Sequence, residues 1–173
     1  MTGPQQSSQE RSQERPAGFR HVCRVLAELG HASEPVWLEV AARTSEQAAL
    51  ALGVSVGQIA KSVIFRRMED DRAVLVIASG DRRVDESRVT ARVGPVGRAD
   101  AAFVKLATGF SIGGVAPVGH ATPVLCLIDR ELFRFQEIWA AAGHPNGVFR
   151  LAPQDLERLT GAPVLDVTQQ EPA

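Results

Sequence analysis

The stretch that decides how this chain folds is Thr108-Gly-Phe-Ser-Ile-Gly-Gly-Val-Ala-Pro-Val-Gly-His120. Each of its four glycines would cost about 1 kcal/mol relative to alanine inside a helix, whereas a loop with positive φ angles accommodates them. The amides of Gly113 and Gly114 are then free to face a ligand oxygen, and Pro117 removes one donor and stiffens the end of the loop. The alternative is an ordinary glycine-rich turn. The stretch has neither the Gly-Lys-Ser/Thr ending of a P-loop nor a G-x-G-x-x-G pattern.

Regular elements are predicted on both sides of this loop. Asp100 is a suitable N-cap for a helix over residues 101–107 that leads into it. After the loop, an apolar strand over residues 123–128 ends at Asp129, and two more strands are expected over 138–141 and 148–151. Pro153 begins a last helix, and a short strand is expected over residues 164–167.

The N-terminal half has the spacing of short helices followed by a hairpin. Apolar residues predict a helix over 19–29, and residues 36–40 could form a short strand. Thr44 and Ser55 each begin a capping box, the second of which predicts a short helix that carries Ile59 and Ala60 and ends at Lys61. Residues 63–65 and 74–78 are expected to pair as a β-hairpin.

These elements predict an α/β fold with a mixed β-sheet flanked by short helices, because the strands and helices do not alternate strictly. A chain of 173 residues suits one domain with a sizeable core. Residues 1–18 contain almost nothing apolar and are expected to be a disordered tail. Residues 19–173 are expected to form the domain.

Composition excludes several classes of protein. No apolar run approaches the roughly 20 residues that span a bilayer, and the polar N-terminus does not have the pattern of a secretory signal. Two cysteines far apart indicate neither a disulfide framework nor a metal motif, which favours a cytoplasmic location. A net charge of −1 means that any RNA partner has to be held by a local basic patch.

Three polar residues occupy positions where chemistry is common. Lys61 is expected at an element boundary, where its amine could reach a substrate or could simply be solvated. Asp129 ends a buried strand and could act on a ligand or cap the following turn. His144 lies between Gly143 and Pro145 and could position a ligand or close its loop. No His or Cys pair has ligand spacing, so neither a metal nor another cofactor is expected.

The order of these pieces resembles the YbaK/EbsC family, which contains the editing domain of prolyl-tRNA synthetase and its free-standing relatives. The similarity is collinear from about Thr44 to Val167. It is carried by Thr44-Ser-Glu-Gln-Ala-Ala, Gly57-Gln-Ile-Ala-Lys-Ser-Val-Ile-Phe65, Ser79-Gly-Asp-Arg-Arg-Val-Asp85, the glycine loop, Ala142-Gly-His-Pro-Asn146 and Leu151-Ala-Pro-Gln-Asp-Leu156.

The resemblance implies a metal-independent, cofactor-free deacylase that hydrolyses the ester between a wrong amino acid and the 3′ acceptor end of a tRNA. That amino acid is expected to be small and the tRNA to be tRNA-Pro, with an association with prolyl-tRNA synthetase as a further expectation. In such relatives the lysine that matches Lys61 is the key side chain, and the Gly-x-x-x-Pro element that matches Gly113–Pro117 shapes the pocket floor. The residues expected to act in catalysis are Lys61, Gly113 and Gly114, and those expected to bind the substrate are Thr108, Gly109, Pro117, Asp129 and His144.

Two other functions fit the same residues. One is a module that binds aminoacyl-tRNA or a nucleotide without turnover, and hydrolysis by the purified protein would exclude it. The other is a hydrolase of small esters, which would cleave free aminoacyl esters as well as aminoacyl-tRNA. The sequence alone does not identify the amino acid, the tRNA or the oligomeric state.

Overall fold

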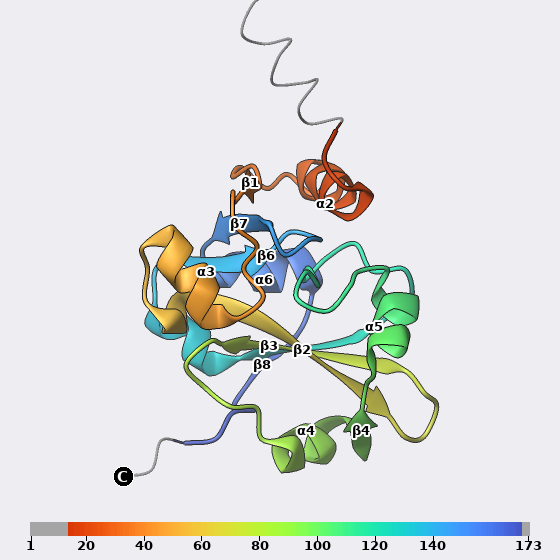
Figure 1. Cartoon of the computed structure of the whole chain (residues 1–173). Coiled ribbons are helices and arrows are strands. Elements are labelled where there is room, and N and C mark those ends of the chain that lie inside the picture. Colours follow the sequence, from red (N-terminus) through yellow and green to blue (C-terminus); the bar gives the residue numbers. More distant parts are fainter. Residues whose placement is uncertain (1–13, 171–173) are drawn as a thin grey trace, which may run out of the picture.

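A mixed sheet of eight strands forms the centre of the computed structural model, which describes residues 14–170 (Figure 1). The helices of this part of the chain are α2 (Ala17–Glu28), α3 (Ser45–Leu52), α4 (Glu86–Val93), α5 (Ala101–Thr108) and α6 (Pro153–Thr160), with 3₁₀ turns η1 (Val56–Gln58) and η2 (Arg130–Arg134). The strands are β1 (Val36–Trp37), β2 (Ile59–Arg67), β3 (Ala73–Ser79), β4 (Val96–Arg98), β5 (Leu125–Asp129), β6 (Ile138–Ala141), β7 (Gly147–Leu151) and β8 (Val164–Leu165).

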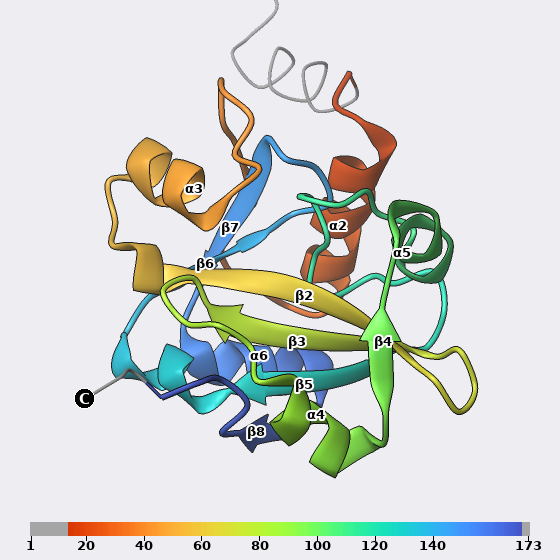
Figure 2. The same ribbon diagram turned by 60° about the horizontal axis from the view of Figure 1, so that its bottom comes forward.

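The strands follow the spatial order β1-β7-β6-β2-β3-β5-β8, and β4 also pairs with β2. Parallel pairs (β2 with β6, β3 with β5, β5 with β8) and antiparallel pairs (β1 with β7, β6 with β7, β2 with β3, β2 with β4) occur together. The prediction of a mixed α/β sheet is therefore confirmed. Figure 2 shows β2, β3 and β5 side by side, with α6 behind them.

Strand β3 is buried along its whole length because both faces of the sheet are covered. Successive side chains of a strand point to opposite faces. Leu75 and Ile77 belong to the larger core cluster, which also contains residues of α2, α5, α6 and the glycine loop. Val74 and Val76 belong to a second cluster, in which Val89 of α4 packs against the other face. The hairpin of β2 and β3 is thereby held firmly in the middle of the molecule.

The helix starts follow the sequence closely. The Thr44 hydroxyl accepts a hydrogen bond from the Gln47 amide at 3.1 Å, and the carboxylates of Asp85 and Asp100 cap α4 and α5. The Gln47 side chain closes back on the Arg43 amide, one residue before the position that a capping box predicts. These caps fix α3 beside the first residues of β2.

The predicted helix through Lys61 is wrong. Only Val56–Gln58 form a 3₁₀ turn, and Lys61 is the third residue of β2. Ala60 pairs with β3 on one side and with Ala140 of β6 on the other, so sheet pairing overrides the local capping signal. The amine of Lys61 therefore projects from the interior of a sheet and not from its edge.

The N-terminal boundary also differs from the prediction. Helix α2 begins at Ala17, so Ala17 and Gly18 belong to the helix and not to a tail, while residues 1–13 lie outside the described part of the chain. The strands predicted over 36–40 and 164–167 are both shorter, at two residues each. Within residues 14–170 no helix is long and apolar enough to cross a membrane.

Candidate functional site

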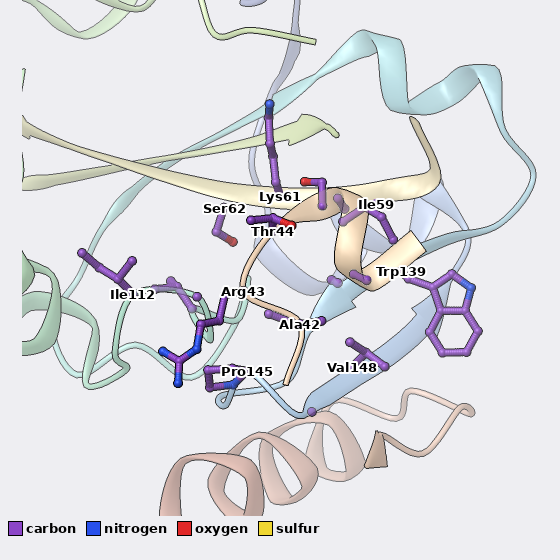
Figure 3. A pocket seen from close by; sticks show the side chains of 18 residues that line it. Ala42, Arg43, Thr44, Ile59, Lys61, Ser62, Ile112, Trp139, Pro145 and Val148 are labelled. Carbon is purple, nitrogen blue, oxygen red and sulfur yellow. The ribbon is translucent and has the colours of Figure 1, made fainter. Parts of the chain in front are cut away.

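A pocket of about 330 Å³ lies between the start of α3, the first residues of β2, the glycine loop, β6 and the turn before β7. Its walls are largely apolar and small, with alanines 42, 48, 60, 140 and 141 among them. Figure 3 shows Ile112 and Trp139 at opposite ends of this pocket, with β2 crossing the view above them. The pocket thus lies where five segments meet, some of them distant in the sequence.

The polar side chains of the lining are two cations, three hydroxyl groups and the indole of Trp139. Arg43 and Lys61 supply the cations, and the hydroxyl groups belong to Thr44, Ser45 and Ser62. The described residues that line this pocket include no carboxylate, imidazole or thiol. A reaction here therefore has cations and amides available for developing negative charge, and no side chain with the ordinary pKa of a general base.

Lys61 lies on the rim of the pocket. Its Nζ donates a hydrogen bond to the carbonyl of Arg82, and Figure 3 shows the amine directed away from Arg43 and Pro145. Burial lowers the pKa of Lys61 below its ordinary value of 10.5, while the carboxylates of Glu46, Asp81 and Asp129 oppose that shift.

Arg43 is the cation that lies near the glycine loop, and sequence reasoning missed it. Figure 3 shows its side chain directed between Ile112 and Pro145. Its Cα lies 3.9 Å from the position of a Cβ built on Gly113. Among the described residues no carboxylate forms an ion pair with it. The only sequence signal is its place immediately before the Thr44 cap.

The glycine loop is held at several points along its length. At its start the Thr108 hydroxyl accepts from the Phe110 amide at 3.1 Å, and the Ala121 amide closes the loop on the Thr108 carbonyl at 3.0 Å. Further along, the His21 ring contacts the Gly119 carbonyl at 2.8 Å and the His120 ring contacts the Ala116 carbonyl at 2.7 Å. The loop is therefore a fixed wall of the pocket.

The two central glycines differ from each other. Gly113 lines the pocket at a φ of 90°, and within the described chain its amide has no hydrogen-bond acceptor. The prediction that the Gly114 amide is free is wrong, because this amide donates to the Ser111 carbonyl at 3.0 Å. Gly113 is thus the better placed of the two to offer an amide to a ligand oxygen.

His144 lies behind the glycine loop and does not line the pocket. Its ring stacks on Trp37 with centroids 4.9 Å apart, and its Nδ1 accepts from the Asn146 amide at 3.1 Å. Burial, with a smaller contribution from the charge of Arg43, lowers the pKa of His144 below 6.5. These contacts fit a residue that closes the turn, and the predicted role in substrate binding stays a prediction.

Asp129 is fully buried away from the pocket lining, at the end of β5. Its carboxylate accepts from the Thr168 hydroxyl at 3.1 and 3.2 Å and from the Val167 amide at 3.5 Å. Burial raises the pKa of Asp129 above 3.8, although these hydrogen bonds oppose the shift. Its visible contacts thus join β5 to the C-terminal segment.

The other predicted binding residues also lie off the pocket. Thr108 is buried, and Gly109 ends α5 with its carbonyl bonded to the Lys105 amine at 3.1 Å. Pro117 lines a separate surface depression together with Gly119 and His120. Of the predicted site residues, the structure brings together Lys61 and Gly113.

Part of the positive charge between Lys61 and Lys105 is paired, for example Arg67 with Asp70 at 2.6 Å and Arg88 with Asp85 at 3.5 Å. No group of three or more His, Cys, Asp or Glu side chains within residues 14–170 could hold a metal ion.

Similarity to known proteins covers the same region of the chain. The model of the aminoacyl-tRNA editing domain family matches residues 39–159. The uncharacterized protein YwhH of Bacillus subtilis is 37% identical over 123 residues, which are 70% of this chain and 78% of that protein. The proline–tRNA ligase of Thermoanaerobacter sp. is 28% identical over 94 residues, which are 52% of this chain and only 16% of that enzyme.

Solved structures agree with this assignment. A structure described as a proposed trans-editing enzyme for prolyl-tRNA synthetase has a TM-score of 0.84 and 39% identity over 91% of this chain and 100% of that one. The hypothetical protein APE2540 has a TM-score of 0.80 and 29% identity over 86% of this chain and 99% of that one. The family match includes Arg43, Lys61 and Gly113, which are the polar and glycine elements of the pocket. This chain belongs to the aminoacyl-tRNA editing domain family.

Proposed function

We propose that this protein hydrolyses the ester that joins a wrongly attached amino acid to the 3′ end of a tRNA. One observation carries the proposal: the pocket in the family region has the unpartnered Gly113 amide in its wall, with Arg43 and Lys61 at its margins. Ester hydrolysis develops negative charge on the carbonyl oxygen, and removal of one donor to such an oxyanion typically costs about 3 kcal/mol.

The proposed reaction begins when water attacks the ester carbonyl and forms a tetrahedral intermediate. The Gly113 amide faces the resulting oxyanion. The bond from the carbonyl carbon to the ribose oxygen then breaks, the ribose oxygen takes a proton, and the free amino acid leaves. Since the described lining offers no carboxylate or imidazole, the ribose hydroxyl beside the ester is the group we assign to guide the proton.

We assign Lys61 to a phosphate of the acceptor end and not to the attacking water. Its amine is directed away from Arg43 and the turn at Pro145, toward the rim of the pocket. A lysine ammonium has three N–H donors, so the bond to the Arg82 carbonyl leaves two for a phosphate.

The pocket favours a small amino acid. A volume of about 330 Å³ is near the lower end of ligand pockets, and it has to hold part of the terminal ribose as well. Because the chain is similar to a segment of proline–tRNA ligases and to a free-standing protein, we infer action in trans on tRNA-Pro.

The test is a panel of tRNA-Pro molecules charged with alanine, serine, cysteine or proline, incubated with the purified protein. We expect loss of at least one small wrong amino acid and retention of proline. Lys61→Ala is the matched control, and we expect it to raise KM because it removes a contact to a phosphate. Binding without hydrolysis for every charged tRNA would replace the proposal with a binding module, and equal cleavage of free aminoacyl esters would replace it with a small-ester hydrolase.

A further inference from the structure

The amine of Lys61 is bound to a turn that follows the neighbouring strand. Lys61 pairs with Ala78 in the β2–β3 ladder, and β3 ends one residue later at Ser79. The chain then turns, with the Arg82 amide donating to the Ser79 carbonyl at 3.0 Å. This turn presents the Arg82 carbonyl to the Lys61 amine. The position of that amine therefore depends on the position of the turn.

Arg134 of η2 holds the turn from outside the sheet. Its guanidinium donates to both carboxylate oxygens of Asp81, at 2.8 and 3.3 Å, and to the Ser79 hydroxyl at 2.8 Å. Although partial burial opposes ionisation of Asp81, these bonds from Arg134 and Ser79 hold its pKa below 3.8. A two-pronged arginine–carboxylate contact fixes direction as well as distance.

Glu131 joins the same group of side chains. Its backbone carbonyl accepts a hydrogen bond from Arg134 Nε at 2.8 Å, and its carboxylate forms ion pairs with Arg134 Nε at 3.1 Å and with Arg82 Nη2 at 3.4 Å. The guanidinium of Arg134 also lies over the Phe135 ring, 4.8 Å from its centroid. On the far side of the turn, the Gln169 amide donates to the Arg83 carbonyl at 2.8 Å. The side chains of Glu131 and Arg134 thus hold the turn at one place, and the backbone of the C-terminal segment holds it at Arg83.

We propose that Arg134 and Asp81 are positioning residues that fix the Arg82 carbonyl, and through it the Lys61 amine, for binding of a phosphate of the acceptor end. This inference rests on the proposed function for its kinetic part. Neither residue lines the pocket, so neither is expected to touch the reacting ester.

Stability alone is a weak explanation for this group of charges. Partly exposed ion pairs typically contribute about 0–1 kcal/mol each, and Arg134 and Asp81 keep about a third of their side chains exposed (33% and 36%). Placement of a binding group is a stronger effect, since a misplacement of about 1 Å can cost roughly 100-fold in rate. Asp81 directly precedes Arg82 in the turn, and the Arg82 carbonyl binds the amine that faces the rim of the pocket.

A kinetic experiment tests the proposal with Arg134→Gln and Asp81→Asn. Asp81→Asn nearly keeps the shape of the side chain and guards against loss of folding in the arginine variant. Arg130→Gln is the matched control, because Arg130 lies on the same 3₁₀ turn and pairs with the exposed Asp166 at 3.3 Å. We expect KM for the mischarged tRNA to rise about tenfold in both test variants with kcat nearly unchanged, and to stay within about twofold in the control.

A spectroscopic experiment does not need the proposed activity. The chain has only two lysines, Lys61 and Lys105, so lysine labelled with ¹³C and ¹⁵N gives two side-chain signals in the full-length protein. Lys61→Arg assigns them. We expect the Lys61 side-chain order parameter to fall in Arg134→Gln and in Asp81→Asn, and the Lys105 signal to stay as it is. Lys105 serves as an internal control because it bonds to Gly109, far from the turn in the sequence.

The outcomes separate the two proposals. If the wild-type protein cleaves no mischarged tRNA, the proposed function fails while the Lys61 signal still decides whether the turn is held by Arg134 and Asp81. An unchanged order parameter in both variants overturns the positioning role. An unchanged KM in both variants, with a raised KM in Lys61→Ala, overturns its importance for substrate binding. A fall in kcat alone, matched by Arg130→Gln, indicates general damage to the fold and also counts against the proposal.

Discussion

The backbone of Gly114 packs directly against the backbone of His144: a Cβ at Gly114 would lie 2.7 Å from the His144 Cα and 2.8 Å from its nitrogen. Neither atom can move without moving the turn before β7. The absence of a side chain at Gly114 is therefore explained by contact between the glycine loop and this turn.

Gly114→Ala should consequently damage the fold. Forcing a methyl group into a packed contact costs about 1–3 kcal/mol, so we expect a clear loss of unfolding free energy in urea. Turnover and tRNA binding should fall together because the pocket wall moves as a unit. An unchanged urea midpoint would show that the loop and the turn can separate at little cost.

Gly113→Ala should act differently. A Cβ there would be in ordinary contact, 3.7 Å from Pro145 Cγ, so only the positive φ of 90° is strained, at about 1–2 kcal/mol. Gly161→Ala is the matched control, because Gly161 has a φ of 67° and open space around it. We expect similar losses of stability in the two variants, and slower single-turnover deacylation in Gly113→Ala alone, more so for bulkier acyl groups. Equal kinetics in both would remove Gly113 from the site.

The sequence predicts contacts between neighbouring residues better than contacts between distant ones. The caps at Thr44 and Asp100 were predictable because each side chain bonds an amide three residues away. The reason for Gly114 lies 30 residues downstream, in the backbone of His144. Local sequence patterns do not predict contacts between residues that are far apart in the chain. The proximity of Arg43 to the glycine loop is a second contact of this kind.

For Lys61, the sequence indicated the importance of the residue but not its secondary structure. Its importance was expected from the family resemblance, yet its secondary structure was predicted wrongly. Residues 59–61 follow a strong local helix signal, but Ile59 and Ala60 pair with Trp139 and Ala140, about 80 residues later in the chain. Pairing between β2 and β6 thus determines that these residues are extended, and it also determines the direction of the Lys61 amine.

Asp129 offers a test based on pH. Its pKa is raised in the folded protein, so folding favours the protonated carboxyl, and this contribution to stability is present at low pH and is lost as the pH rises through the folded pKa. We expect Asp129→Asn to become more stable relative to the wild type as the pH increases from 4 to 7. The measurement is the difference in unfolding free energy at each pH, in which the other carboxylates cancel.

The same variant addresses the predicted binding role of Asp129. Because its visible contacts are with Thr168 and Val167, we expect nearly wild-type KM in Asp129→Asn. A large rise in KM in a stably folded variant would instead support substrate binding by this carboxylate.

Metal dependence can be tested directly. The mechanism proposed here uses an amide, two cations and water, so deacylation should persist in EDTA at a concentration that leaves the tRNA folded. Monovalent salt maintains the RNA in both arms, and spontaneous ester hydrolysis without protein is subtracted. Loss of activity in EDTA, restored by one added metal, would contradict the mechanism.

The exposed guanidinium of Arg43 leads to the last prediction. It lies at the mouth of the pocket beside Gly113, and no carboxylate in residues 14–170 pairs with it. We expect it to contact a phosphate of the single-stranded acceptor end. Each such contact adds about 0.7 to the slope of log K against log salt, so Arg43→Gln should weaken binding of uncharged tRNA and lower that slope by about this amount.

Arg98→Gln is the control for Arg43→Gln, because Arg98 is exposed on β4 and is not part of the pocket lining. Uncharged tRNA is the deciding probe, since it carries the phosphates but no acyl group. A slope that Arg43→Gln leaves unchanged, together with a loss of activity confined to tRNA charged with an acidic amino acid, would assign Arg43 to the acyl group instead. Equal loss of binding in both variants would show that Arg43 adds only to the general charge of the surface.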